Sequence, residues 1–209
     1  MTEDFEHHLG SVQRKVSTSN RNGRPARSVT LIRDYDTTVD DLWDAISNPE
    51  RLCRWYAQVA GDLWRGGRFK IEGNASGTIL KCQPPEHLAL TWEYGEAISW
   101  VDVRVQGTND GRARLTLEHT GPRDDHMVEF GPGAGGVGWE WSFMELARHF
   151  ADHAGQRFDE DAFVATDAGR AFVASSSVAW CQAAVVDGDD PDAALAAAER
   201  TRAFFVGDS

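Results

Sequence analysis

The sequence contains no long apolar run and few cysteines. No segment reaches the roughly 18 consecutive apolar residues that a membrane-spanning helix needs, and residues 1–25 lack the apolar centre of a signal peptide. The three cysteines, Cys53, Cys82 and Cys181, are widely spaced, which favours free thiols in a reducing compartment over a disulfide framework. We therefore expect a cytoplasmic protein without a membrane span.

Positive charge is also scarce. The 33 acidic residues outnumber the 21 basic residues and give a net charge of -12 at pH 7. A surface this acidic repels phosphate groups, which excludes nucleic acid as a partner. Residues 1–27 are polar and interrupted by glycine and proline, so we expect a flexible N-terminal arm there.

Residues 28–55 open the expected folded domain. The stretch "SVTLIRDYDT" (28–37) is rich in residues that favour strands. Thr38 predicts the N-cap of a short amphipathic helix over residues 39–47. Asn48 followed by Pro49 predicts a second helix that begins directly afterwards. The segment is thus expected to form a strand and two short helices.

The following segment has the pattern of an antiparallel meander. In "GDLWRGGRFKIEGNASGTILKCQPPEHLALTW" (61–92), glycines and prolines separate short runs in which apolar and polar residues alternate. The alternation continues over residues 101–105 and 115–119, with the turn sequence "GTNDG" between the two runs. The pattern predicts an antiparallel sheet of about six or seven strands that is apolar on one face only.

A long helix is expected to cover that face. In "GGVGWEWSFMELARHFADH", one stripe at helical spacing is formed by Trp139, Phe143, Leu146 and Phe150. The glycine-rich stretch "GPGAGGVG" (131–138) comes just before this helix, and we expect it to act as a hinge or lid. Strands followed by a covering helix predict an α+β fold over residues 28–155.

Residues 156–209 form an alanine-rich extension. Residues 169–186 and 191–205 predict a helical hairpin, the second helix with Asp190 as its N-cap and Pro191 at its first position. The hairpin is too apolar for a free tail, and we expect it to pack on the core or on a second subunit in a homodimer. That packing would bury Phe172, Val173, Trp180, Leu195, Phe204 and Phe205.

Several landmarks occur in a characteristic order. They are "TVDDLWDAISNPERLCRWYA", "GDLWRGGRFKIEG", "GTILKCQPPEHLALTW", "ARLTLEHTG" and "VGWEWSFMEL". Over residues 28–152 this order resembles the activator of heat-shock-protein-90 ATPase homologue-like family, in the START-like (SRPBCC, polyketide cyclase/lipid transport) superfamily. The resemblance implies a helix-grip fold, in which a curved sheet surrounds a long helix and a cavity between them holds a hydrophobic small molecule.

The sequence carries no motif for a cofactor or a metal. It lacks a Gly-x-Ser-x-Gly elbow, a phosphate-binding loop and a dinucleotide fingerprint, so no cofactor is expected. His149 and His153 have a spacing that can ligate a metal, but "HFADH" lacks the glutamate of zinc peptidases, so no metal site is predicted. His119 has the inward position of its strand, where it can act as a base or orient a ligand. Alternatively, neighbouring backbone or Glu118 satisfies its hydrogen bonds.

The leading hypothesis is a non-catalytic container for a hydrophobic or aromatic small molecule. One alternative is an aromatase/cyclase-type enzyme in which His119 moves protons in the same cavity. Another is an interaction protein whose C-terminal hairpin binds a second copy or a chaperone-associated partner. The candidate ligand-binding residues are those expected to face inward: Trp43, Phe69, Ile71, Leu90, Trp92, Val101, Val103, Leu117, His119, Trp139 and Phe143.

Overall fold

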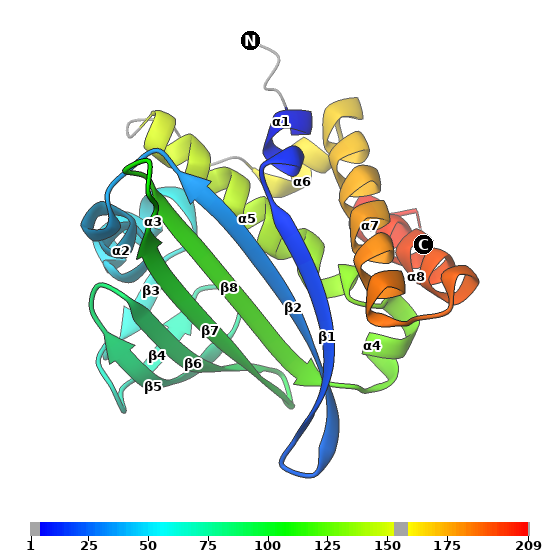
Figure 1. The fold of residues 1–209 in the computed structure, drawn as a ribbon, viewed down its shortest axis with the longest axis horizontal. Coiled ribbons are helices and arrows are strands. Elements are labelled where there is room, and N and C mark those ends of the chain that lie inside the picture. The colour runs from blue at the N-terminus through cyan, green and yellow to red at the C-terminus, as the bar shows by residue number, and fades with distance from the viewer. Residues whose placement is uncertain (1–4, 153–158, 209) are drawn as a thin grey trace. The chain divides into compact units, whose positions relative to one another are not determined.

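The computed structural model describes residues 5–152 and 159–208 (Figure 1). The chain forms two compact units. The first comprises Met1–Leu31, Pro122–Trp141 and Phe158–Ser209, and the second comprises Ile32–Gly121 and Ser142–Arg157. Three elements, β2 (Arg24–Tyr35), β8 (Ala113–Pro122) and α5 (Gly133–Ala151), have residues in both units. In the described part of the chain, no helix combines the length and the apolar character that crossing a membrane requires.

The described residues contain one eight-stranded sheet with the strand order β1-β2-β8-β7-β6-β5-β4-β3. Strands β3 to β8 are antiparallel to their neighbours, as the predicted meander requires. The sheet with its long helix confirms the predicted α+β class and helix-grip fold. The remaining strands are β1 (Gln13–Arg21), β3 (Val59–Gly61), β4 (Arg68–Ile71), β5 (Ser76–Gln83), β6 (His87–Tyr94), β7 (Ala97–Gly107) and β8 (Ala113–Pro122).

The N-terminal segment differs from the prediction. Instead of an arm without regular structure, residues 5–27 contain α1 (Phe5–Gly10), β1 and the beginning of β2. The turn between the two strands is Asn22-Gly23, and both residues have positive φ angles, 53° and 78°. Asn-Gly is the preferred sequence of a two-residue hairpin turn. The strand pair is fixed by burial of Val16 and Ala26, so the prediction of a flexible arm was wrong there.

In the second unit, the two short helices begin where the sequence predicts. Thr38 caps α2 (Val39–Ser47) by accepting a hydrogen bond from the amide of Asp41. Asn48 caps α3 (Pro49–Trp55), which has proline at its start. Residues 142–151 of α5 contact β2 through Tyr35, whose ring centroid lies 6.3 Å from that of Phe143. This contact packs the C-terminal part of the long helix against the sheet.

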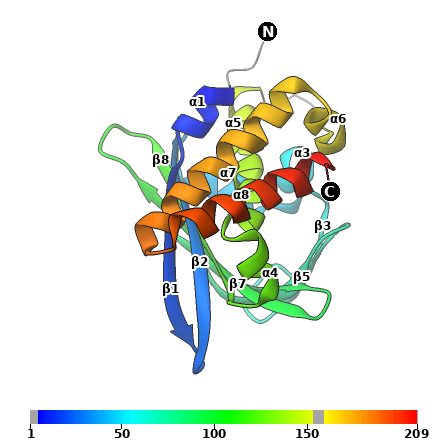
Figure 2. The ribbon, with the colours of Figure 1, turned by 90° about the vertical axis from the view of Figure 1, so that its right-hand side faces the viewer.

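The first unit contains the predicted helical hairpin. Helices α7 (Asp167–Asp187) and α8 (Pro191–Val206) lie side by side in Figures 1 and 2. Trp141 of α5 contacts Phe163 of α6 (Glu160–Val164) at 4.8 Å and Phe172 of α7 at 6.2 Å between ring centroids. Leu195 and Phe204 of α8 are 58% and 60% exposed in the single chain. The Phe204 ring contacts that of Phe130, with 5.6 Å between the ring centroids.

The glycine-rich stretch is helical, so the predicted hinge or lid is wrong for its main part. Helix α4 (Asp125–Phe130) ends just before it, and residues 133–138 form the first turns of α5. A β-carbon on Gly136 would lie 2.3 Å from Cε2 of Trp180, which is fully buried. Glycine at this position therefore allows the α7 indole to pack directly against the α5 backbone.

This packing predicts opposite effects for two neighbouring substitutions. In Gly136→Ala, the added methyl group overlaps the Trp180 ring, and we expect the free energy of unfolding to fall by about 1–3 kcal/mol. Gly135→Ala is the matched control, because nothing lies within 4 Å of its β-carbon position. Because alanine has a higher helix propensity than glycine, the Gly135→Ala substitution should raise the free energy of unfolding by about 1 kcal/mol. Urea denaturation followed by circular dichroism measures both values, and equal shifts in one direction would contradict the contact.

Candidate functional site

The candidate site is the apolar face of the central strands in the second unit. Directly opposed residues of antiparallel strands lie on the same face. The register pairs Leu90 of β6 with Val101 of β7, and Val101 with His119 of β8. Two residues further along each strand, and therefore on the same face, Val103 is paired with Leu117. The structure therefore brings these five predicted residues together on one face.

The same face extends across the outer strands. Phe69 and Ile71 of β4 form a buried cluster with Ile79 of β5. Leu90 and Trp92 of β6 pack against this cluster and are only partly buried. The predicted alternation of residues 69–71 and 88–92 thus correctly identified which side chains share the apolar face.

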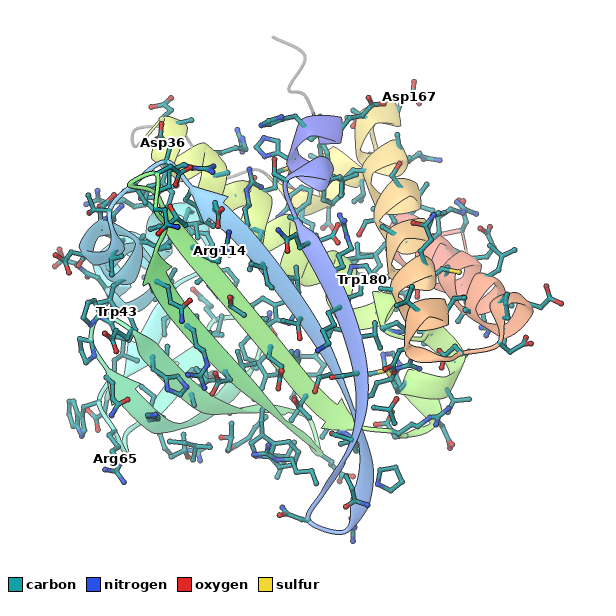
Figure 3. The ribbon with its side chains drawn as sticks, in the orientation of Figure 1. Asp36, Trp43, Arg65, Arg114, Asp167 and Trp180 are labelled. Atoms are coloured by element: carbon teal, nitrogen blue, oxygen red, sulfur yellow. The ribbon has the colours of Figure 1, made fainter. Side chains whose placement is uncertain are left out.

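Burial divides the predicted ligand-binding residues into two groups. Leu90, Trp92 and His119 keep some exposed surface in the second unit, and Trp139 does so in the first unit. Exposed apolar surface is what a ligand can cover, so the three residues of the second unit are the stronger candidates for contact. The others fill the core: Trp43 (labelled in Figure 3), Phe69, Ile71, Val101, Val103, Leu117 and Phe143.

A short chain of hydrogen bonds orients His119. The hydroxyl of Ser99 donates to the carbonyl oxygen of Trp92 at 3.2 Å, and Nε2 of His119 lies 2.8 Å from the same hydroxyl oxygen. The hydrogen bond between the imidazole and the hydroxyl group holds the ring in place, and its direction depends on the tautomer of His119.

The environment keeps this imidazole neutral. Burial lowers the pKa of His119 from its usual value of 6.5 to about 4. The Trp92 ring lies beside it, with 6.0 Å between the two ring centroids. The structure shows Ser99, on the adjacent strand β7, as a hydrogen-bond partner of His119.

Two residues of this region were missed by the sequence analysis. Ser99 continues the period-two pattern of Val101 and Val103, and that pattern could have identified it. Tyr56 follows α3 and packs against the cluster around Phe69. Burial raises the pKa of the Tyr56 hydroxyl, although its side chain keeps some exposed surface. Tyr56 could not have been found from the period of any strand, because it lies in a connecting segment.

Metal binding was not predicted for His149 and His153, and the structure places His149 against an arginine. Its Nε2 lies 3.1 Å from a guanidinium nitrogen of Arg51. The same guanidinium group forms ion pairs with Asp41 and Asp44 of α2. His153 lies outside the described residues. Within residues 5–152 and 159–208, no group of three or more His, Cys, Asp and Glu side chains is placed to hold a metal ion.

The low pKa of His119 predicts a pH-dependent stability. The unfolded chain binds the proton more tightly than the folded chain, so stability falls as the pH drops below 6.5 and the loss is complete near pH 4. The difference between the two pKa values corresponds to roughly 3 kcal/mol. We expect His119→Gln to remove this contribution. Urea denaturation from pH 7 to pH 4 tests it, and identical pH profiles for both proteins would contradict a desolvated His119.

Comparison with solved structures shows clear relatives. The crystal structure of CalU16 from Micromonospora echinospora is 34% identical, covers 68% of this chain and 87% of its own, and has a TM-score of 0.59. The solution structure of CalU16 is 28% identical in sequence. The match covers 85% of this chain and 97% of the CalU16 chain, with a TM-score of 0.67. DynU16, a protein in the dynemicin biosynthetic locus, is 19% identical in sequence. The match covers 63% of this chain and 50% of the DynU16 chain, and the shared fold has a TM-score of 0.55. No curated protein matches the sequence.

The family assignment agrees with these structures and with the resemblance seen in the sequence. Residues 36–151, more than half of the chain, match the model of the family described as "Activator of Hsp90 ATPase homolog 1-like protein". The matched region begins just before the two short helices and ends with α5. It contains the apolar face, Ser99 and His119. The chain therefore belongs to the Activator of Hsp90 ATPase homolog 1-like protein family.

Proposed function

We propose that the protein binds a hydrophobic or aromatic small molecule on the apolar face of β6 to β8, without catalysing a reaction on it. The observation that carries the proposal is the incomplete burial of Leu90, Trp92 and His119 within an apolar face. Apolar surface that neighbouring side chains leave partly exposed is surface that a ligand can cover. The START-like superfamily, which the sequence resembles, places its ligands between the sheet and the long helix.

Two titratable side chains support the presence of an internal space. Tyr56 and His119 are surrounded by enough protein for burial to shift both pKa values toward the neutral forms. Both residues are nevertheless only partly buried. Deep position combined with accessible surface is typical of side chains that border a cavity.

The charges in this region favour a neutral ligand. His119 is uncharged above about pH 4, and the protein as a whole carries a net charge of -12. An anionic ligand would be repelled by the overall field and would find no cationic imidazole to compensate it. Trp92 and Leu90 supply apolar contact, and His119 supplies the polar contact that orients the ligand.

One observation favours a second candidate, an enzyme of the aromatase/cyclase type. The hydrogen bond to Ser99 holds His119 in place, and the imidazole is neutral, as a general base requires. The two functions differ in their response to His119→Gln. Catalysis requires that turnover is abolished while binding persists, whereas a container loses only about one hydrogen bond, roughly 1 kcal/mol.

A pair of substitutions on β6 tests the proposed binding face. Leu90→Trp adds volume on the partly exposed apolar face, and we expect it to weaken binding about tenfold or more, because overpacking costs at least about 1.4 kcal/mol. The probe is N-phenyl-1-naphthylamine, a neutral aromatic molecule whose fluorescence rises in apolar surroundings. Fluorescence titration of the purified protein gives its dissociation constant.

Ala89→Leu is the matched control. Ala89 is adjacent to Leu90 in β6 and points to the opposite face of the sheet, because neighbouring residues of a strand alternate. The control should bind the probe like the unmodified protein. Equal affinity of all three proteins would place the probe elsewhere and overturn the proposed face. Circular dichroism verifies that each variant is folded.

A further inference from the structure

A second group of polar side chains lies buried in the first unit. It consists of Glu140 of α5 and of Ser176, Ser177 and Trp180 of α7, each at most 2% exposed. Oε2 of Glu140, both serine hydroxyl oxygens and Nε1 of Trp180 have no hydrogen-bond partner among the described residues. Four unsatisfied buried groups on two helices call for a common explanation.

The contacts between the two helices place these groups together. Gly136 of α5 lies against the Trp180 ring, and Trp141 lies against Phe172 at 6.2 Å between ring centroids. Residue numbers increase along α5 as they decrease along α7, so the helices are antiparallel. Because both rise equally per residue, Glu140, one turn after Gly136, is level with Ser176, one turn before Trp180. Figure 3 labels Trp180 on α7.

The third side of the group is β1. Nε of Arg14 donates to Oε1 of Glu140, which forms a buried ion pair. The remaining guanidinium nitrogens of Arg14 donate to backbone carbonyl groups, those of Val12 and Leu9, each at 3.0 Å. Arg14 thus satisfies one oxygen of the Glu140 carboxylate, and its other nitrogens are directed elsewhere. The second oxygen, Oε2, needs a different donor.

The chemistry of the four groups is complementary. Glu140 Oε2 accepts hydrogen bonds, Trp180 Nε1 donates one, and each serine hydroxyl can do both. A small neutral molecule with donors and acceptors satisfies all of them, whereas a cation would be repelled by the indole N–H and an anion by the carboxylate. Water is the molecule of this kind that folded proteins enclose, with two to four polar partners each.

We propose that Glu140, Ser176, Ser177 and Trp180 form an internal binding site for ordered water at the contact of β1, α5 and α7. Bound water donates to Oε2 of Glu140 and accepts from Nε1 of Trp180. The serine hydroxyls extend the network along α7. The ion pair of Arg14 with Glu140 is thereby completed, since a buried carboxylate is stable only when both of its oxygens are satisfied.

Three consecutive serines of α7 allow a matched test on the full-length chain. Ser176→Ala and Ser177→Ala remove hydroxyl groups that bond to the bound water. Ser175→Ala is the control, because Ser175 is exposed and its replacement changes only the helix propensity. We expect the midpoints of urea denaturation of the Ser176 and Ser177 variants to lie below that of the Ser175 variant. Midpoints equal to or above the control would show that the hydroxyl groups are unbonded in the folded protein, which would overturn the proposal.

A crystal structure at a resolution that orders water gives an independent result. We expect density within hydrogen-bonding distance of both Glu140 Oε2 and Trp180 Nε1. A direct bond from Trp180 to Glu140, with the serine hydroxyls donating to carbonyl groups of the preceding turn, would overturn the proposal. Density for a molecule larger than water would contradict it as well, and would identify a different ligand.

Discussion

The contact of Tyr35 with Phe143 is the interaction on which the second unit depends. The Tyr35 hydroxyl donates to the carbonyl oxygen of Phe143 at 3.1 Å, and a guanidinium nitrogen of Arg33 approaches the same oxygen at 3.5 Å. A helix carbonyl has two lone pairs, so it can accept the bond from Tyr35 in addition to the one from its own helix. Two residues of β2 thereby fix where residues 142–151 of α5 meet the sheet.

The apolar face of the sheet is only partly covered by other side chains. Val101, Val103 and Leu117 are buried, whereas Leu90, Trp92 and His119 keep exposed surface. His119 is the polar group of the incompletely covered region, and Ser99 holds it through a hydrogen bond. The chemistry of the proposed site is therefore set by one hydrogen bond between adjacent strands and by desolvation of the imidazole.

Much of the fold follows from local signals in the sequence. Thr38, Asn48 and Asp190 were recognised as helix caps because a short polar side chain before an apolar helix satisfies free amides. The hairpin at Asn22-Gly23 had an equally clear signal, but the polar composition of the segment outweighed it. The glycines of residues 133–138 were misjudged because their role depends on a distant residue, Trp180. No local pattern reveals such a contact.

The site was predictable only in part, for a similar reason. Alternation identified the shared face of Leu90, Val101 and His119, since strand period alone determines it. It could not tell which of these side chains remain partly exposed, because exposure depends on how neighbouring elements pack. Tyr56 was missed because a connecting segment has no period, whereas Ser99 was missed although it continues the period-two pattern of Val101 and Val103. The buried polar group around Glu140 likewise depends on three elements far apart in the sequence.

The most direct test of the account is an NMR titration that follows the indole N–H signals of the eight tryptophans while N-phenyl-1-naphthylamine is added. Binding on the apolar face of β6 to β8 predicts a saturable shift of the Trp92 signal. Trp180, buried in the first unit, and Trp64, which is 62% exposed, should keep their signals unchanged. A shift confined to Trp64, or no saturable shift at Trp92, would contradict a ligand-binding site on this face.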